Sequence, residues 1–352
     1  MRRKKRWVWG LILAVALATA GYQVGLKNFA EREKALRSRL RHELVARFHE
    51  EAAEAAAHFG LHPYRPAQLP GPTGTRQDRA VVLIHGLDDP GKVWMNLAPA
   101  LATEGHQVYQ LLYPNDQPIH DSALYFANVL KGLRSRGIRR IAIVAHSMGG
   151  LVSREMLTHP GINYQGQATD DQAPEVYGLI MVGTPNQGVE IARFRILSEF
   201  REQISRTLLG QGHWLGWLVD GAGEAKLDLL PESSFLKTLN GRPHPPDVAL
   251  LTIAGIAAGL GQTATAPSGE WISGQDSPRT RSQWAQALKR ITRGVGDGLV
   301  PVDAVRIEGV DFLTVPGNHL TMIRNFSVED ERIPPAIPII LDHISRWEGK
   351  QS

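Results

Sequence analysis

The sequence contains no cysteine. This absence excludes a disulfide framework, a thiol nucleophile and a metal site built on thiolates, although it leaves the redox compartment undecided. A large excess of one charge is also missing, because the formal net charge is only +4. The five basic residues at positions 2–6 alone contribute more positive charge than this, so the rest of the chain is nearly neutral. No basic stretch with interleaved aromatic residues follows them, so we expect no nucleic-acid partner.

Composition places the chain among globular proteins. Hydrophobic residues make up 43% and charged residues 21% of its 352 positions, values that are near the average for globular proteins. Long disorder, a fibrous repeat and a polytopic membrane protein are therefore excluded. The length suits one large catalytic domain with attached segments.

One long uncharged stretch, from Trp7 to Leu26, follows the basic residues. It is about as long as a helix that crosses a bilayer. We therefore expect residues 1–26 to be a basic tail and a single membrane anchor, with the catalytic domain on the non-cytoplasmic side. The alternative is a signal peptide that is cleaved near Ala20, since residues 18–20 are small, and this would give a secreted or periplasmic protein.

Two segments separate this stretch from the predicted domain. Residues 27–60 are rich in Ala, Glu, Arg and Leu and predict a long charged helix. This helix either spaces the domain from the membrane or packs on the domain. Residues 61–78 are rich in proline and glycine, so we expect a linker or a wrapped arm. The catalytic domain is then predicted to cover residues 79–352.

From residue 79 onward, six short apolar runs alternate with helical patterns. The runs end near Gly86, Pro114, Ser147, Gly183, Ile256 and Gly317. Nearly continuous runs of Val, Ile and Leu are typical of strands that are buried on both faces. The alternation predicts an α/β fold with a doubly wound, mostly parallel sheet and right-handed crossovers. Ligands of such sheets bind outside the carboxyl ends of the strands, and the polar motifs gather at those ends.

The strongest motif is the sequence AHSMGG at residues 145–150, between a predicted strand and a predicted helix. A tight turn between such elements exposes a serine hydroxyl on a sharp elbow when the flanking residues are small. Ala145 and Gly149 are small, although glycine is the usual residue at both places. We therefore interpret Ser147 as a nucleophile rather than a helix cap. His146 lies inside the elbow and is assigned to packing or hydrogen bonding.

A serine nucleophile needs a base, and the base needs a carboxylate that fixes its tautomer. His319 lies in the loop after the last predicted strand, and Asp297 lies in a glycine-rich loop. They are our candidates for the base and the acid. The competing residues that we considered are His106 and His343 as the base, and Asp303, Asp311, Asp276 and Glu270 as the acid.

Two backbone N–H groups are predicted to stabilise the oxyanion that acyl transfer creates. Met148 directly follows the predicted nucleophile, and Leu87 follows a strand that ends in His-Gly. The adjacent Asp88 and Asp89 have no further ligand at metal-binding spacing, so we interpret them as loop residues and expect neither a metal nor a cofactor.

With these motifs in place, residues 79–347 resemble the α/β-hydrolase superfamily. Within it they are similar to the bacterial lipase and esterase branch, which is related to triacylglycerol lipases and PGAP-type hydrolases. The resemblance is carried by the sequences HGL at 85–87, HSMGG at 146–150, VGTP at 182–185, DGLVP at 297–301 and GNHL at 317–320. It implies Ser147 as nucleophile, His319 as base and Asp297 as orienting acid, with Leu87 and Met148 as oxyanion donors.

Two inserted segments are less informative. Residues 189–240 lie where such lipases carry a cap, and the apolar residues at 214–219 either line an acyl pocket or pack the cap onto the domain. We have no functional interpretation for residues 257–296. The sequence thus predicts a hydrolase of lipid or other acyl esters, with an acyltransferase or thioesterase on the same triad, or a non-catalytic scaffold, as alternatives.

Overall fold

The computed structural model describes residues 57–64, 77–87, 89, 91–115, 117–189, 225–257, 296–327 and 330–349. The predicted anchor at residues 7–26 and most of the predicted charged helix lie outside these ranges. So do residues 190–224 of the predicted cap and residues 258–295 of the second insertion. Within the described ranges, no helix combines the length and the apolar character that a bilayer-crossing helix needs.

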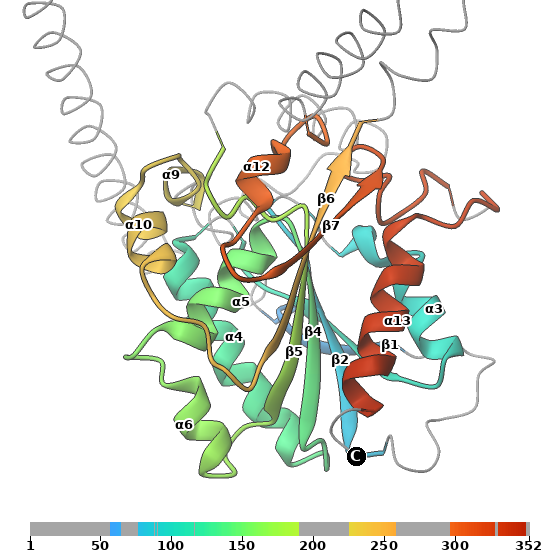
Figure 1. Cartoon of the computed structure of the whole chain (residues 1–352). Coiled ribbons are helices and arrows are strands. Elements are labelled where there is room, and N and C mark those ends of the chain that lie inside the picture. Colours follow the sequence, from blue (N-terminus) through green and yellow to red (C-terminus); the bar gives the residue numbers. More distant parts are fainter. Residues whose placement is uncertain are drawn as a thin grey trace, which may run out of the picture.

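A seven-stranded sheet forms the centre of the described structure (Figure 1). Its strands are β1 (Gly60–Tyr64), β2 (Arg79–Ile84), β3 (Gln107–Leu112), β4 (Arg140–His146), β5 (Glu175–Val182), β6 (Ala249–Ile256) and β7 (Asp311–Pro316). Their order across the sheet is β1-β3-β2-β4-β5-β6-β7, and every neighbouring pair is parallel except β1 with β3. All six strands expected from the apolar runs are present, so the prediction of a mostly parallel sheet is confirmed.

Strand β1 corrects the predicted boundary between linker and domain. Residues 61–64 were expected in a linker or arm, yet they pair antiparallel with β3 in a register that sets Pro63 opposite Tyr109. A proline fits an edge strand, because only one side of such a strand bonds to a neighbour. Residues 57–60 form a turn and the start of β1 instead of the end of the predicted helix. The sheet therefore begins before residue 79.

Helices cover both faces of the sheet (Figure 1). Helices α4 (Ile119–Arg134), α5 (Met148–Thr158) and α6 (Tyr164–Thr169) lie on one face, and α3 (Leu97–Thr103) and α13 (Ala336–Gly349) lie on the other. The shorter helical segments are η2 (Lys92–Trp94), α9 (Ala225–Asp228), α10 (Ser234–Asn240) and α12 (Val302–Val305). The doubly wound architecture is thus confirmed.

Side chains that alternate in direction along the strands form two separate hydrophobic cores, one on each face of the sheet. In β2, Val82 packs in a cluster that includes Phe126 of α4. Its neighbour Val81 packs in another cluster that includes Ile340 of α13. Successive side chains of a strand point to opposite faces, so a strand in the middle of this sheet must be apolar at every position. This explains the nearly continuous runs of β2, β4 and β5, whereas most residues of the edge strand β7 are exposed.

The loops that carry the candidate site residues follow the carboxyl ends of the parallel strands. Gly86 follows β2, Ser147 follows β4, Gly183 follows β5 and His319 follows β7. Asp297 lies beside the end of β6, because Ala257, which follows β6, donates from its N–H to the carbonyl oxygen of the adjacent Gly296 at 2.8 Å. Parallel strands end at the same edge of a sheet, so the topology brings these loops together.

Gly178 offers a test of the packing between the sheet and α13. A Cβ added there would lie far inside van der Waals distance of the Trp347 ring, so Gly178→Ala should lower the free energy of unfolding by about 1–3 kcal/mol. Gly132, in α4, has no atom within 4 Å of an added Cβ. The matched substitution Gly132→Ala should raise the stability by about 0.5–1 kcal/mol. Urea denaturation measures both, and equal effects would contradict the packing.

Candidate active site

The turn at Ser147 has an unusual backbone conformation. Strand β4 ends at His146, helix α5 begins at Met148, and Ser147 between them has φ 55° and ψ −129°. A residue with a side chain seldom adopts a positive φ, and such a conformation costs about 1–3 kcal/mol. A hydrogen bond of 2.8 Å from Ser147 N to Val182 O ties the turn to the end of β5. The sharp elbow expected at this serine is therefore present.

Two glycines let the neighbouring loop approach this turn. A Cβ on Gly149 would lie 2.6 Å from the carbonyl oxygen of His85, and one on Gly86 would lie 2.6 Å from Ser147 Cβ. Real side chains do not tolerate such distances. The loop after β2 thus lies directly against Ser147 because both contacting positions lack a side chain.

The carboxylate of Asp297 is held by three donors. Its Oδ1 accepts hydrogen bonds from Leu299 N at 2.9 Å and Val300 N at 2.7 Å, and its Oδ2 accepts one from His319 Nδ1 at 2.7 Å. The Asp297 side chain is fully buried. A buried carboxylate is stable only when it is paired and hydrogen-bonded, and these contacts supply both conditions. They also fix the direction of the histidine ring.

Pairing with Asp297 decides the tautomer of His319. A carboxylate only accepts, so the hydrogen of the neutral ring lies on Nδ1, and Nε2 keeps its lone pair. Nε2 is buried and has no hydrogen-bond partner among the residues that the structure describes. The ring also packs near Gly183, where an added Cβ would lie 3.1 Å from His319 Cε1. An unpartnered acceptor therefore lies at the edge of the sheet where Ser147 lies.

His146 connects the elbow to the His319 loop. Its Nε2 donates to the carbonyl oxygen of His319 at 2.9 Å, and the two ring centroids are 4.7 Å apart. Burial lowers the pKa of His146 well below its usual value, and the nearby His319 lowers it further. His146 is therefore neutral at physiological pH, and its predicted role in packing and hydrogen bonding is confirmed.

The predicted oxyanion donors lie on either side of this turn. Met148 opens helix α5, whose first N–H groups have no acceptor within the helix. Leu87 follows Gly86, which contacts Ser147. A hydrogen bond of 2.8 Å from Tyr113 Oη to the carbonyl oxygen of His85 holds the loop that contains Leu87. Both N–H groups thus belong to backbone segments that are fixed beside Ser147.

The competing candidates lie elsewhere. His106 lies next to Glu348 at 3.5 Å, at the amino end of β3, and His343 bonds to Ile339 O within α13. Asp303 is exposed and pairs with Arg306. Asp311 begins β7, whereas Asp276 and Glu270 lie outside the described residues. Among the candidates that the structure describes, it pairs His319 with Asp297.

Sequence reasoning missed a second group of titratable side chains, which consists of His120, Glu155 and His159 and which we call the α4–α5 cluster. Their nitrogen and oxygen atoms lie within 4.8 Å of one another. The only signal in the sequence was the spacing of Glu155 and His159, which places both on one face of a helix. His120 comes from another helix, so no local pattern could reveal it.

Comparison with known proteins bears on the family of the chain. A sequence model described as "Alpha/beta hydrolase family" matches residues 81–325. Among curated proteins, none matches the chain.

Solved structures show a similar fold at low identity. The mature form of the lipase BlEst2 from Bacillus licheniformis is 18% identical, with a TM-score of 0.50, and the match covers 80% of this chain and 97% of that one. The metagenomic carboxyl esterase MGS0156 is also 18% identical, with a TM-score of 0.44 and coverage of 82% and 83%. The phospholipase PlaB from Legionella pneumophila is 16% identical, with a TM-score of 0.48 and coverage of 75% and 59%.

The buried His146 predicts a pH dependence of stability. In the unfolded chain this histidine takes up a proton below about pH 6.5, whereas in the folded protein its pKa is much lower. The unfolded state then binds more protons, so stability falls as the pH falls below about 6.5, by up to about 1.4 kcal/mol per pH unit. His146→Gln keeps a donor for His319 O and should remove the contribution of His146 to this change of stability with pH.

Urea denaturation between pH 7 and pH 5 measures this slope. The control is His62→Gln, on the outer strand β1, which should reproduce the slope of the native protein. Parallel curves for the native protein and His146→Gln would contradict the assignment.

Proposed function

Because the chain belongs to the alpha/beta hydrolase family, we propose that it is a serine hydrolase that cleaves carboxylic esters, with lipids or other acyl esters as substrates. Ser147 is the proposed nucleophile, His319 the base and Asp297 the orienting acid. The observation that carries the proposal is the His319 ring, which bonds through Nδ1 to Asp297 at 2.7 Å while the buried Nε2 has no partner within the described part of the chain. Such a ring is prepared to accept a proton from a neighbouring serine.

The proposed reaction begins when Ser147 Oγ attacks the ester carbonyl and its proton passes to His319 Nε2. The carbonyl oxygen becomes negative and accepts hydrogen bonds from the N–H groups of Leu87 and Met148. The tetrahedral intermediate collapses, His319 gives its proton to the departing alcohol, and the acyl group remains on Ser147. Water then gives a proton to His319 and attacks the acyl-enzyme. As this second intermediate collapses, His319 returns the proton to Ser147 Oγ and the acid leaves.

Asp297 has two tasks in this scheme. It keeps the hydrogen of the neutral His319 ring on Nδ1, and it stabilises the positive ring that forms during each proton transfer. The bonds from Leu299 N and Val300 N to Oδ1 leave Oδ2 facing the ring. The carboxylate therefore needs no rearrangement when the ring becomes charged.

The start of helix α5 supports the proposed oxyanion site. The helix runs from Met148 to Thr158, and the partial positive charge at its N-terminus favours a negative oxygen beside Ser147. In other enzymes, removal of one oxyanion donor lowers kcat by about 100- to 1000-fold. Both proposed donors belong to the main chain, so the contribution of this site does not depend on a side-chain conformation.

Ser147→Ala tests the proposed nucleophile. We expect hydrolysis of p-nitrophenyl esters, from acetyl to palmitoyl, to fall by at least about 1000-fold, because the acyl-enzyme cannot form. Ser135 lies on the exposed surface at the end of α4, and Ser135→Ala should retain full activity. The profile of the native protein across chain lengths separates esterase from lipase behaviour. If the Ser147 variant kept its activity, or if the native protein cleaved no ester, the proposal would fail.

Asp297→Asn tests the tautomer argument. The amide oxygen of an asparagine would accept the bonds from Leu299 N and Val300 N, which turns the NH2 group toward His319 Nδ1. That nitrogen must then accept, so the ring hydrogen moves to Nε2 and the ring can no longer take a proton from Ser147. We expect kcat to fall by about 10,000-fold with little change in KM. A loss confined to KM would contradict this explanation.

A further inference from the structure

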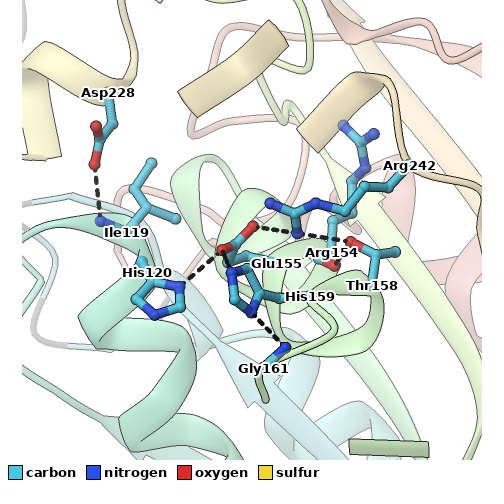
Figure 2. Close-up of polar contacts among 9 residues, drawn as sticks. All are labelled: Ile119, His120, Arg154, Glu155, Thr158, His159, Gly161, Asp228 and Arg242. Carbon is cyan, nitrogen blue, oxygen red and sulfur yellow. Dashed lines mark hydrogen bonds and ion pairs between the residues drawn. The ribbon is translucent and has the colours of Figure 1, made fainter. Parts of the chain in front are cut away.

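The α4–α5 cluster lies away from the proposed catalytic residues. Glu155 is eight positions after Ser147 along helix α5, which corresponds to about 12 Å along the helix axis. Figure 2 shows the rings of His120 and His159 pointing toward the carboxylate of Glu155, with Arg242 on its other side. His120 Nδ1 donates to Glu155 Oε1 at 2.9 Å, and His159 Nε2 is 4.0 Å from the same oxygen.

We propose that His120, Glu155 and His159 bind a zinc ion that links α4 to α5. Two imidazoles and one carboxylate form a donor set that zinc uses in proteins, with a water molecule as the usual fourth ligand. His159 directly follows the last residue of α5, and its backbone N–H donates to the carbonyl oxygen of Glu155 at 2.9 Å, so the two residues lie one turn apart. This site would need no thiolate, which the sequence does not contain.

The distances suit an ion after small side-chain rotations. Zinc bonds of about 2.0–2.1 Å in a tetrahedron place the ligand atoms about 3.3 Å apart. The separations from Glu155 Oε1 are 2.9 Å to His120 Nδ1 and 4.0 Å to His159 Nε2. The two histidine side chains are 38% and 30% exposed, whereas that of Glu155 is 2% exposed. The carboxylate is thus fixed, the rings have room to adjust, and solvent reaches the site.

Arg242 orients the carboxylate from outside the cluster. Its Nη1 donates to Glu155 Oε2 at 2.7 Å and to Thr158 Oγ1 at 3.3 Å. Metal-binding carboxylates are usually held by such an outer hydrogen bond. This hydrogen bond uses Glu155 Oε2, so Oε1 faces His120 and His159. The guanidinium also balances the charge of Glu155, so we expect a weaker site than an isolated carboxylate would form.

Binding requires both rings to present a lone pair. In His120 the hydrogen on Nδ1 moves to Nε2. In His159, Nδ1 accepts a bond from Gly161 N at 3.1 Å, so the hydrogen of the neutral ring lies on Nε2 and must move to Nδ1. That change breaks the bond from Gly161, which is exposed, and water can replace it at little cost. No net proton is released when both rings are neutral beforehand.

A zinc ion here would join segments that are distant in the sequence. His120 lies in the first turn of α4, and the backbone N–H of the adjacent Ile119 donates to Asp228 Oδ2 at 3.0 Å. Arg242 follows α10. The site would therefore stabilise the packing of α4, α5 and residues 225–242 on one another.

Zinc binding by the tag-free full-length protein tests this inference. After equilibrium dialysis against zinc, we expect one ion per chain by elemental analysis, together with a rise in the Tm that grows with the zinc concentration. His120→Gln and His159→Gln should each weaken binding by more than about 100-fold, because even the loss of an outer partner costs about 10- to 100-fold. The matched control His343→Gln, on helix α13, should bind as the native protein does.

The outcomes distinguish this site from the proposed catalytic one. Metal content and Tm do not depend on ester hydrolysis, so the site is tested even if the proposed function fails. The Tm of each variant with zinc is compared with its own Tm without zinc, so the test does not depend on any change in stability from loss of the His120 bond to the buried Glu155. If the native protein retains no zinc, or if both variants retain one ion per chain, the inference is wrong.

Discussion

The turn at Ser147 is the constraint on which the rest of the site depends. A non-glycine residue there has a positive φ, and only the surrounding structure can hold such a conformation. Pairing of His146 with Val182 and the bond from Ser147 N to Val182 O supply that support from β5. The same turn sets the direction in which α5 leaves the sheet. It therefore positions Ser147 at one end of the helix and Glu155 and His159 toward the other.

Buried charge is the second organising feature. The carboxylates of Asp297 and Glu155 are both almost completely buried, and each accepts from more than one donor. They differ in their partners. Asp297 faces one histidine and two backbone N–H groups, which gives a single fixed hydrogen-bond direction. Glu155 faces an arginine and two partly exposed histidines, which gives a site that adjusts. The first arrangement suits repeated proton transfer, and the second suits a ligand.

What the sequence could predict follows from the range of each interaction. The apolar runs of β2, β4 and β5 predicted their strands because a strand that is buried on both faces must be apolar throughout. Strand β1 contains His62 and Pro63 and depends on its pairing with β3, so its local pattern indicated a linker. Asp297 and His319 could be predicted because loops after strands of a parallel sheet meet at one edge. The contact of His120 with Glu155 lies between two helices, and no periodicity encodes such a contact.

Main-chain hydrogen bonds close both inserted segments at their bases. Val189 N donates to Leu229 O at 2.8 Å, and Ala257 N donates to Gly296 O at 2.8 Å. The two ends of each segment are therefore joined to each other by a hydrogen bond. The length of the segment does not alter the register of the strands on either side. Exchange of either segment between these hydrogen-bonded ends would therefore leave Ser147, Asp297 and His319 in their places.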